Sequence, residues 1–130
     1  MVGQQKESVL LTKWLAAFHR TSPQWKRVRL GQVANKEEAK LYKVILRWCD
    51  AIFIEDGTVY IVEAKLRPPF GVIGQLEGYG ELFKVTPEFS QYSNWPVKLI
   101  LLAPMLDLNI AELCKKKDIT YEVWKPKDWE

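Results

Sequence analysis

The sequence predicts an α/β fold in which a mixed β-sheet is flanked by helices. Three observations predict it. Segments with the apolar spacing of a helix alternate with strand-like segments along the chain. Two strand-like runs, residues 47–55 and 58–66, are separated by Asp56-Gly57, the strongest short signal for an antiparallel hairpin. A nearly continuous apolar run at 97–103 is typical of a strand that is covered on both faces.

The elements before the hairpin begin with a helix predicted over residues 6–19. Apolar side chains recur there at the spacing of one helical face: Leu11, Trp14, Leu15 and Phe18. Thr-Ser-Pro at 21–23 ends this helix, because proline disfavours helical geometry in the residue before it. Residues 25–33 alternate well enough for a strand. Residues 35–43 are compatible with a short helix or with a solvated loop.

The elements after the hairpin alternate between helix and strand. Residues 67–71, Arg-Pro-Pro-Phe-Gly, break the sheet pattern, and residues 72–85 have the spacing of a second long helix. Beyond the apolar strand, we expect Asp107 to cap a third helix that runs through Lys116. Residues 119–124 alternate as a last strand. The predicted order is αβ(α)ββαβαβ, with helices on both faces of the sheet.

Length and composition predict one domain, residues 1–130. The chain is 48% hydrophobic and 27% charged and carries six tryptophans, which excludes a disordered protein. No apolar run is long enough to span a membrane, and the N-terminal residues lack the apolar core of a secretory signal. Two cysteines without a CxxC pair fit a reducing compartment, so we expect a cytoplasmic protein. The net charge of +3 favours anionic partners only weakly.

The hairpin register brings two carboxylates together. A two-residue turn pairs Glu55 with Thr58, and counting along both strands from there pairs Asp50 with Glu63. Opposed residues have Cβ atoms about 4.5–5.5 Å apart, and strict alternation puts both carboxylates on the face of the hairpin isoleucines. Facing like charges destabilise a sheet, and a divalent cation between them would remove that cost. Carboxylate oxygens with retained waters are how Mg²⁺ is commonly held.

A lysine, Lys65, follows Glu63 on the same predicted face. A Glu-x-Lys pair on an exposed surface is usually just solvated, but this one ends an apolar face, which favours a site. Asp50, twelve intervening residues and Glu63-Ala64-Lys65 together resemble the PD-(D/E)XK nuclease superfamily. The resemblance covers about residues 6–124 and implies the restriction-endonuclease-like αβββαβ core. Cys49 stands where proline is common in that family, at a position that varies.

Two further features resemble the same superfamily. Gln75 and Tyr79 match the QxxxY signature of RecB-like members and share one helical face; packing of Tyr79 into the core is the alternative. Several of these nucleases take an extra acidic metal ligand from the first helix. Glu7 fits that role on the inward helix face, and a glutamate favoured by the helix dipole is the alternative. Glu37 and Glu38 are weaker candidates for it.

The resemblance implies a Mg²⁺-dependent deoxyribonuclease, with Mn²⁺ expected to substitute. Asp50, Glu63 and the backbone carbonyl of Ala64 would hold the metal, with Glu7 as a further ligand. Lys65 would orient or help deprotonate the attacking water. The QxxxY glutamine and tyrosine would position this lysine or a phosphate.

DNA is the expected partner, and RNA stays open. Basic residues are expected to contact the nucleic-acid backbone: Arg47, Arg67, Lys84, Lys26, Arg27 and Arg29. For the last three, a solvated edge strand is the alternative. A Holliday-junction or branched-DNA resolvase of the same fold and a non-catalytic DNA-binding or interaction module are alternative functions. Endonuclease or exonuclease action, specificity, a homodimer and a recruiting protein partner also stay open.

Overall fold

The computed structural model describes residues 3–32, 35–41 and 45–129. They form a five-stranded mixed sheet whose strands lie side by side in chain order. The strands are β1 (Gln24–Leu30), β2 (Arg47–Glu55), β3 (Thr58–Ala64), β4 (Val97–Ala103) and β5 (Ile119–Val123). The first three pair antiparallel, whereas β3, β4 and β5 run parallel. The predicted α/β class and mixed sheet are confirmed.

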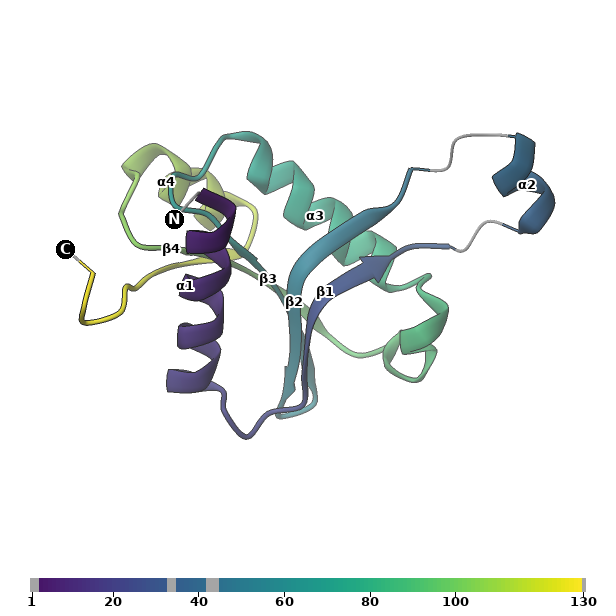
Figure 1. Cartoon of the computed structure of the whole chain (residues 1–130), viewed down its shortest axis with the longest axis horizontal. Coiled ribbons are helices and arrows are strands. Elements are labelled where there is room, and N and C mark those ends of the chain that lie inside the picture. The colour runs from purple at the N-terminus through teal and green to yellow at the C-terminus, as the bar shows by residue number, and fades with distance from the viewer. Residues whose placement is uncertain (1–2, 33–34, 42–44, 130) are drawn as a thin grey trace.

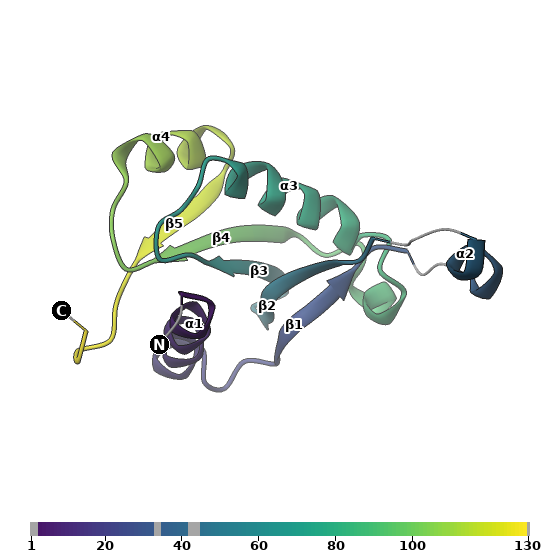
Figure 2. The ribbon, with the colours of Figure 1, turned by 45° about the horizontal axis from the view of Figure 1, so that its top comes forward.

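Helices cover both faces of the sheet (Figure 2). α1 (Gly3–Phe18) lies on one face, and α3 (Gly71–Phe83) and α4 (Leu108–Lys116) lie on the other. The short α2 (Lys36–Leu41) stands apart from the sheet, on the connection between β1 and β2 (Figure 1). None of the described helices is long and apolar enough to cross a membrane.

Two hydrophobic cores, one on each face, hold the layers together. On the α3 face, buried side chains of the sheet and helices pack together, among them Ile52, Ile61, Leu76, Phe83 and Leu101. On the α1 face, the core includes Leu10, Trp14, Phe53, Val62 and Leu102. β4 contributes to both cores, as its continuous apolar sequence predicts.

The hairpin has the predicted register. Asp56 and Gly57 both have positive φ angles, 51° and 73°, as a two-residue type I′ turn requires. Backbone pairing runs from Glu55 with Thr58 to Ala51 with Val62. This register fixes where the two strands end relative to each other, and therefore where the predicted carboxylates lie.

Two other stretches differ from simple expectations. Most of the ambiguous stretch forms α2, which the Asn35 side chain caps by accepting a hydrogen bond from the Glu38 N–H at 2.8 Å. A 3₁₀ segment, η1 (Pro87–Tyr92), lies between α3 and β4 and was not predicted. Residue 33 of the predicted first strand and residues 42 and 43 lie outside the described residues.

Candidate active site

Asp50 and Glu63 meet where the β2–β3 ladder ends. The last backbone pair of the ladder is Ala51 with Val62. Beyond it, side chains replace the backbone pairing: the Asp50 N–H donates to Glu63 Oε1, and the Ala64 N–H donates to Asp50 Oδ2, each at 2.9 Å. The structure therefore brings the two acids together at the predicted pair position, through reciprocal bonds to the backbone.

The side-chain direction at Asp50 differs from the prediction. Strict alternation would put Cys49 and Ala51 on one face, yet Cys49 belongs to the α3-face core and Ala51 to the α1-face core. Asp50 lies between them and lines a pocket together with Glu7 of α1. The expectation that Asp50 shares the face of Ile52, in the α3-face core, is therefore wrong.

The break in side-chain alternation at Asp50 involves the neighbouring strand as well. Arg27 of β1 lies across from Asp50 and has a φ of 51°, the left-handed region that residues with a Cβ rarely adopt. The ladder pairs on either side of it are Lys26 with Ala51 and Val28 with Cys49. The alternation of side chains between the two faces is thus interrupted at the same position in both strands. This paired irregularity turns Asp50 toward α1.

The pocket beside Asp50 has a volume of about 270 Å³ and opens between α1, β1 and the end of β3. It is lined by Gln4, Glu7, Ser8, Leu11, Lys26, Arg27, Asp50 and Lys65. Glu7 is fixed there because its Oε2 accepts a hydrogen bond from the Leu66 N–H at 3.1 Å. Lys65 Nζ lies 3.9 Å from Glu63 Oε2, which links the pocket to the second carboxylate. Glu7 of α1 and Asp50 of β2 therefore share one pocket, and Glu63 of β3 lies next to it.

Burial raises the pKa values of Asp50 and Glu63. Glu63 is 2% exposed, and burial followed by the negative charge of Asp50 raises its pKa to about 8. Burial likewise raises the pKa of Asp50, against the lowering effect of the Ala64 amide hydrogen bond. Burial and then the charge of Glu63 raise the pKa of the Cys49 thiol to about 12. That thiol is therefore a poor nucleophile.

The carboxylates supply part of a metal-binding donor set. Within residues 3–32, 35–41 and 45–129, no three acidic, histidine or cysteine side chains form a ready-made metal cage. Asp50, Glu63 and Glu7 each place one oxygen on a backbone N–H. Mg²⁺ is usually bound through one or two carboxylates, waters and substrate phosphates rather than a full protein cage. The residues present fit that manner of binding.

Gln75 and Tyr79 lie on the other face of the sheet. Gln75 Nε2 donates to Tyr79 Oη at 2.8 Å, and Tyr79 Oη donates to the Trp48 carbonyl at 2.7 Å. Tyr79 belongs to the α3-face core, and burial followed by the charge of Glu63 raises its pKa. The hydrogen bonds of this pair reach the β2 backbone two residues before Asp50, rather than Lys65.

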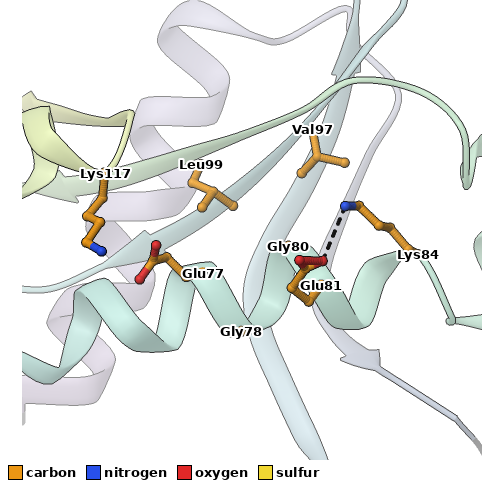
Figure 3. Close-up of a pocket in the computed structure, with 8 residues that line it drawn as sticks. All are labelled: Glu77, Gly78, Gly80, Glu81, Lys84, Val97, Leu99 and Lys117. Carbon is orange, nitrogen blue, oxygen red and sulfur yellow. Dashed lines mark hydrogen bonds and ion pairs between the residues drawn. The ribbon is translucent and has the colours of Figure 1, made fainter.

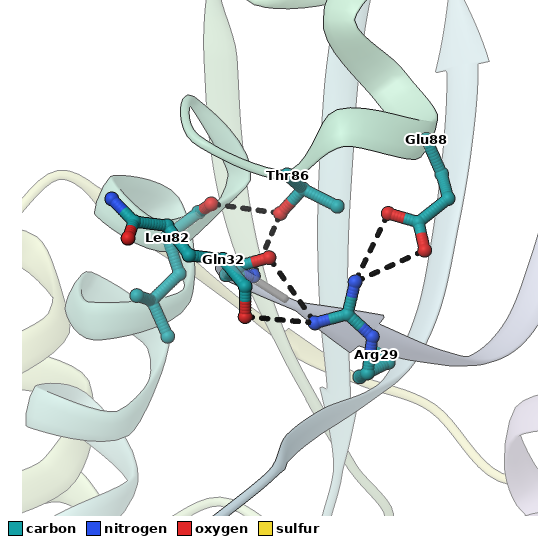
Figure 4. A network of polar contacts seen from close by, with 6 residues as sticks. Arg29, Gln32, Leu82, Thr86 and Glu88 are labelled. Atoms are coloured by element: carbon teal, nitrogen blue, oxygen red, sulfur yellow. Dashed lines mark hydrogen bonds and ion pairs between the residues drawn. The ribbon is translucent and has the colours of Figure 1, made fainter. Parts of the chain in front are cut away.

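The predicted basic contacts on β1 separate into two kinds. Lys26 and Arg27 line the carboxylate pocket, and Lys26 Nζ donates to Thr12 Oγ1 at 2.9 Å. Arg29 instead holds η1 against β1: its guanidinium donates to both carboxylate oxygens of Glu88 at 3.0 Å and to the Gly31 carbonyl at 3.1 Å (Figure 4). Both terminal nitrogens of Arg29 are therefore committed within the protein.

The other three predicted basic residues lie at three separate places in the fold. Arg47 lines a hollow of about 580 Å³ beside α3, together with Gln75. Arg67 is exposed after β3. Lys84 lies at the far end of α3, in a separate pocket of about 500 Å³, and pairs with Glu81 at 3.2 Å (Figure 3). The structure does not bring Lys84 to the carboxylates.

Trp48 is a neighbour of the site that the sequence did not single out. Its side chain is 40% exposed, and the Arg27 guanidinium carbon lies 5.3 Å from the centre of its ring. Its position in the sequence, two residues before Asp50, is the feature from which it could have been predicted as a neighbour of the site. In contrast, the weaker candidates Glu37 and Glu38 lie in the first turn of α2, away from the sheet (Figure 1).

Comparison with known structures identifies the fold. A repair endonuclease from Pyrococcus abyssi matches 91% of this chain with a TM-score of 0.60 and 17% identity. The structure of an EndoMS–dsDNA2 complex matches 95% of it with a TM-score of 0.57 and 17% identity. The fold is endonuclease-like. This chain spans 46% of the length of each matched chain. No family model and no curated protein sequence matches it.

Proposed function

We propose that this chain, as one domain, is a metal-dependent nuclease that hydrolyses phosphodiester bonds of DNA. The observation that carries the proposal is that Glu7 and Asp50 line one pocket beside Lys65, while Glu63 accepts a hydrogen bond from the Asp50 N–H and lies 3.9 Å from the Lys65 amine. Buried acids that repel each other are costly unless a cation compensates them. The endonuclease-like fold supports the same reading.

Each residue has a role in the proposed reaction. Asp50, Glu63 and the Ala64 carbonyl would hold Mg²⁺, or Mn²⁺ in its place, with Glu7 as a further acidic ligand. A bound metal would supply an activated water and would stabilise negative charge on the phosphate. Lys65 would orient the attacking water or help to remove its proton; in its charged form it would offset phosphate charge. Gln75 and Tyr79 act indirectly, by fixing the β2 backbone ahead of Asp50.

DNA is the proposed substrate. One of the matched structures is a complex with double-stranded DNA, and the pocket beside Asp50 carries three basic side chains: Lys26, Arg27 and Lys65. Phosphate contacts of this kind position a nucleic acid without reading its sequence. Recruitment by a protein partner and assembly as a homodimer remain compatible with this proposal.

A cleavage assay tests the proposal. Single-stranded, duplex and branched oligonucleotides of DNA and RNA are incubated with Mg²⁺, with Mn²⁺ or with a chelator. We expect the wild-type protein to cleave DNA only when metal is present. Glu63→Gln and Asp50→Asn should each abolish this cleavage. Lys65→Met should slow it by about 10²–10⁴-fold, the usual contribution of a group that assists proton transfer.

Glu77→Gln is the matched control for these charge changes. Glu77 is an exposed acid of α3 that lines a different pocket, so its loss should leave cleavage unchanged (Figure 3). Exclusive cleavage of four-way junctions would indicate a resolvase. Absence of cleavage on every substrate, or full activity of Glu63→Gln, would leave a non-catalytic module and contradict the proposal.

A further inference from the structure

Arg27 differs from its neighbour Arg29 in what its guanidinium does. Both terminal nitrogens of the Arg29 guanidinium donate within the protein, one to Glu88 and the other to the Gly31 carbonyl (Figure 4). In the part of the chain that the structure describes, the Arg27 guanidinium donates no hydrogen bond and forms no ion pair, although it lines the pocket of Asp50. A planar guanidinium with five unused N–H donors is suited to a phosphate.

The backbone at Arg27 is held in an uncommon conformation. Its φ of 51° is unfavourable for a residue with a Cβ, and a glycine or asparagine would fit more easily. Backbone strain of this kind tends to occur at functional sites. Here it accompanies the step at which Asp50 turns toward the pocket, so the arginine and the carboxylate are presented on the same side.

Trp48 adds an aromatic surface beside this arginine. The guanidinium lies 5.3 Å from the ring centre, and the tryptophan remains 40% exposed. An exposed aromatic ring next to a basic group is the combination by which proteins bind single-stranded nucleic acids, because every base offers a face for stacking. In a duplex the neighbouring base pairs already cover those faces.

We infer that Arg27 and Trp48 form a subsite for one unpaired nucleotide beside the carboxylates, with Arg27 on its phosphate and Trp48 against its base. The inference deepens the proposed function, since it names the form of DNA that the site takes. The substrate is single-stranded DNA, or DNA with an unpaired nucleotide next to the phosphodiester to be cut.

Binding measured without metal separates this subsite from catalysis. Fluorescence anisotropy in a chelator compares a labelled thymidine oligonucleotide with an abasic oligonucleotide of equal length and charge. Trp48→Ala should weaken binding of the thymidine strand by about 5- to 150-fold and leave the abasic strand unchanged. Arg27→Gln should weaken both and lower the slope of log K against log salt by about 0.7.

Trp95→Ala is the matched control. Trp95 is 37% exposed and precedes Val97, which pairs with Val59 at the end of the sheet opposite the carboxylates, so its loss should change neither affinity. Trp48→Phe keeps an aromatic face and should retain most of the affinity, which guards against a folding defect in the alanine variant. Equal effects of Trp48→Ala on both strands, or no binding of the thymidine strand by the wild type, would overturn the subsite. The cleavage assay would still decide the nuclease proposal.

Discussion

The Glu63 carboxyl makes a contribution to stability that depends on pH. Burial and the charge of Asp50 raise its folded-state pKa from 4.5 to about 8. Because the folded protein holds this proton more tightly than the unfolded chain, the contribution is fully present below pH 4.5 and is lost as the pH rises through about 8.

We therefore expect the metal-free protein to melt at a lower temperature at about pH 9 than at about pH 6. Glu63→Gln removes this titration, so its melting temperature should fall less over the same range. Thermal melts followed by circular dichroism in a chelator measure both slopes. Identical pH dependence in the two proteins would show that Glu63 is not the group responsible.

Arg27 allows a test of backbone strain that does not depend on function. A residue with a Cβ pays about 1–2 kcal/mol in the left-handed conformation, whereas glycine adopts it freely. We expect Arg27→Gly to be more stable than Arg27→Ala by about 1 kcal/mol, although both lack the guanidinium. Urea unfolding measures the difference. An alanine variant as stable as the glycine variant would mean that this backbone can relax.

A hydroxyl of α3, that of Tyr79, is hydrogen-bonded to the β2 backbone. Tyr79 Oη accepts from Gln75 and donates to the Trp48 carbonyl, so phenylalanine would leave both groups without this partner. We expect Tyr79→Phe to lower the free energy of unfolding by about 1–3 kcal/mol. The comparison is Tyr60→Phe, since the Tyr60 ring stacks on Phe53 without a described hydroxyl contact. If both variants lose the same stability, the hydroxyl does not tether the two elements.

Elements with local signals were predictable from the sequence. The hairpin register followed from Asp56-Gly57, because the turn chemistry fixes pairing along both strands. The cap of α4 is another such case: Asp107 accepts hydrogen bonds from the N–H groups of Asn109 and Ile110. In contrast, η1 packs Phe89 into the α3-face core, and no short sequence pattern predicts that contact.

At the scale of the whole molecule, the pairing of Asp50 with Glu63 could be predicted, but the direction of Asp50 could not. Alternation is a property of one strand, whereas the reversal requires Arg27 in the neighbouring strand to adopt a positive φ at the same step. The ion pair of Arg29 with Glu88 could not be predicted for a similar reason. Glu88 lies far away in sequence and approaches only when η1 packs beside β1.

Metal binding should appear as stability of the entire fold. If Mg²⁺ binds the folded state alone, a concentration ten times its Kd stabilises the protein by about 1.4 kcal/mol. We expect this gain in the wild type, and its loss both in Asp50→Asn and on adding a chelator. Glu77→Gln should keep it. Thermal melts at increasing Mg²⁺ concentration test the expectation, and an equal gain in Asp50→Asn would place the metal elsewhere.

The two-residue turn at Asp56 and Gly57 also determines where this protein can tolerate a change in length. Surface turns usually accept insertions, because little structure depends on their exact number of residues. Here Asp50 and Glu63 are each about 20 Å along a strand from the turn, yet their meeting depends on it. One inserted residue that shifted the register would move each carboxylate away from its partner. An insertion at this exposed tip could thus be as damaging as replacing either acid.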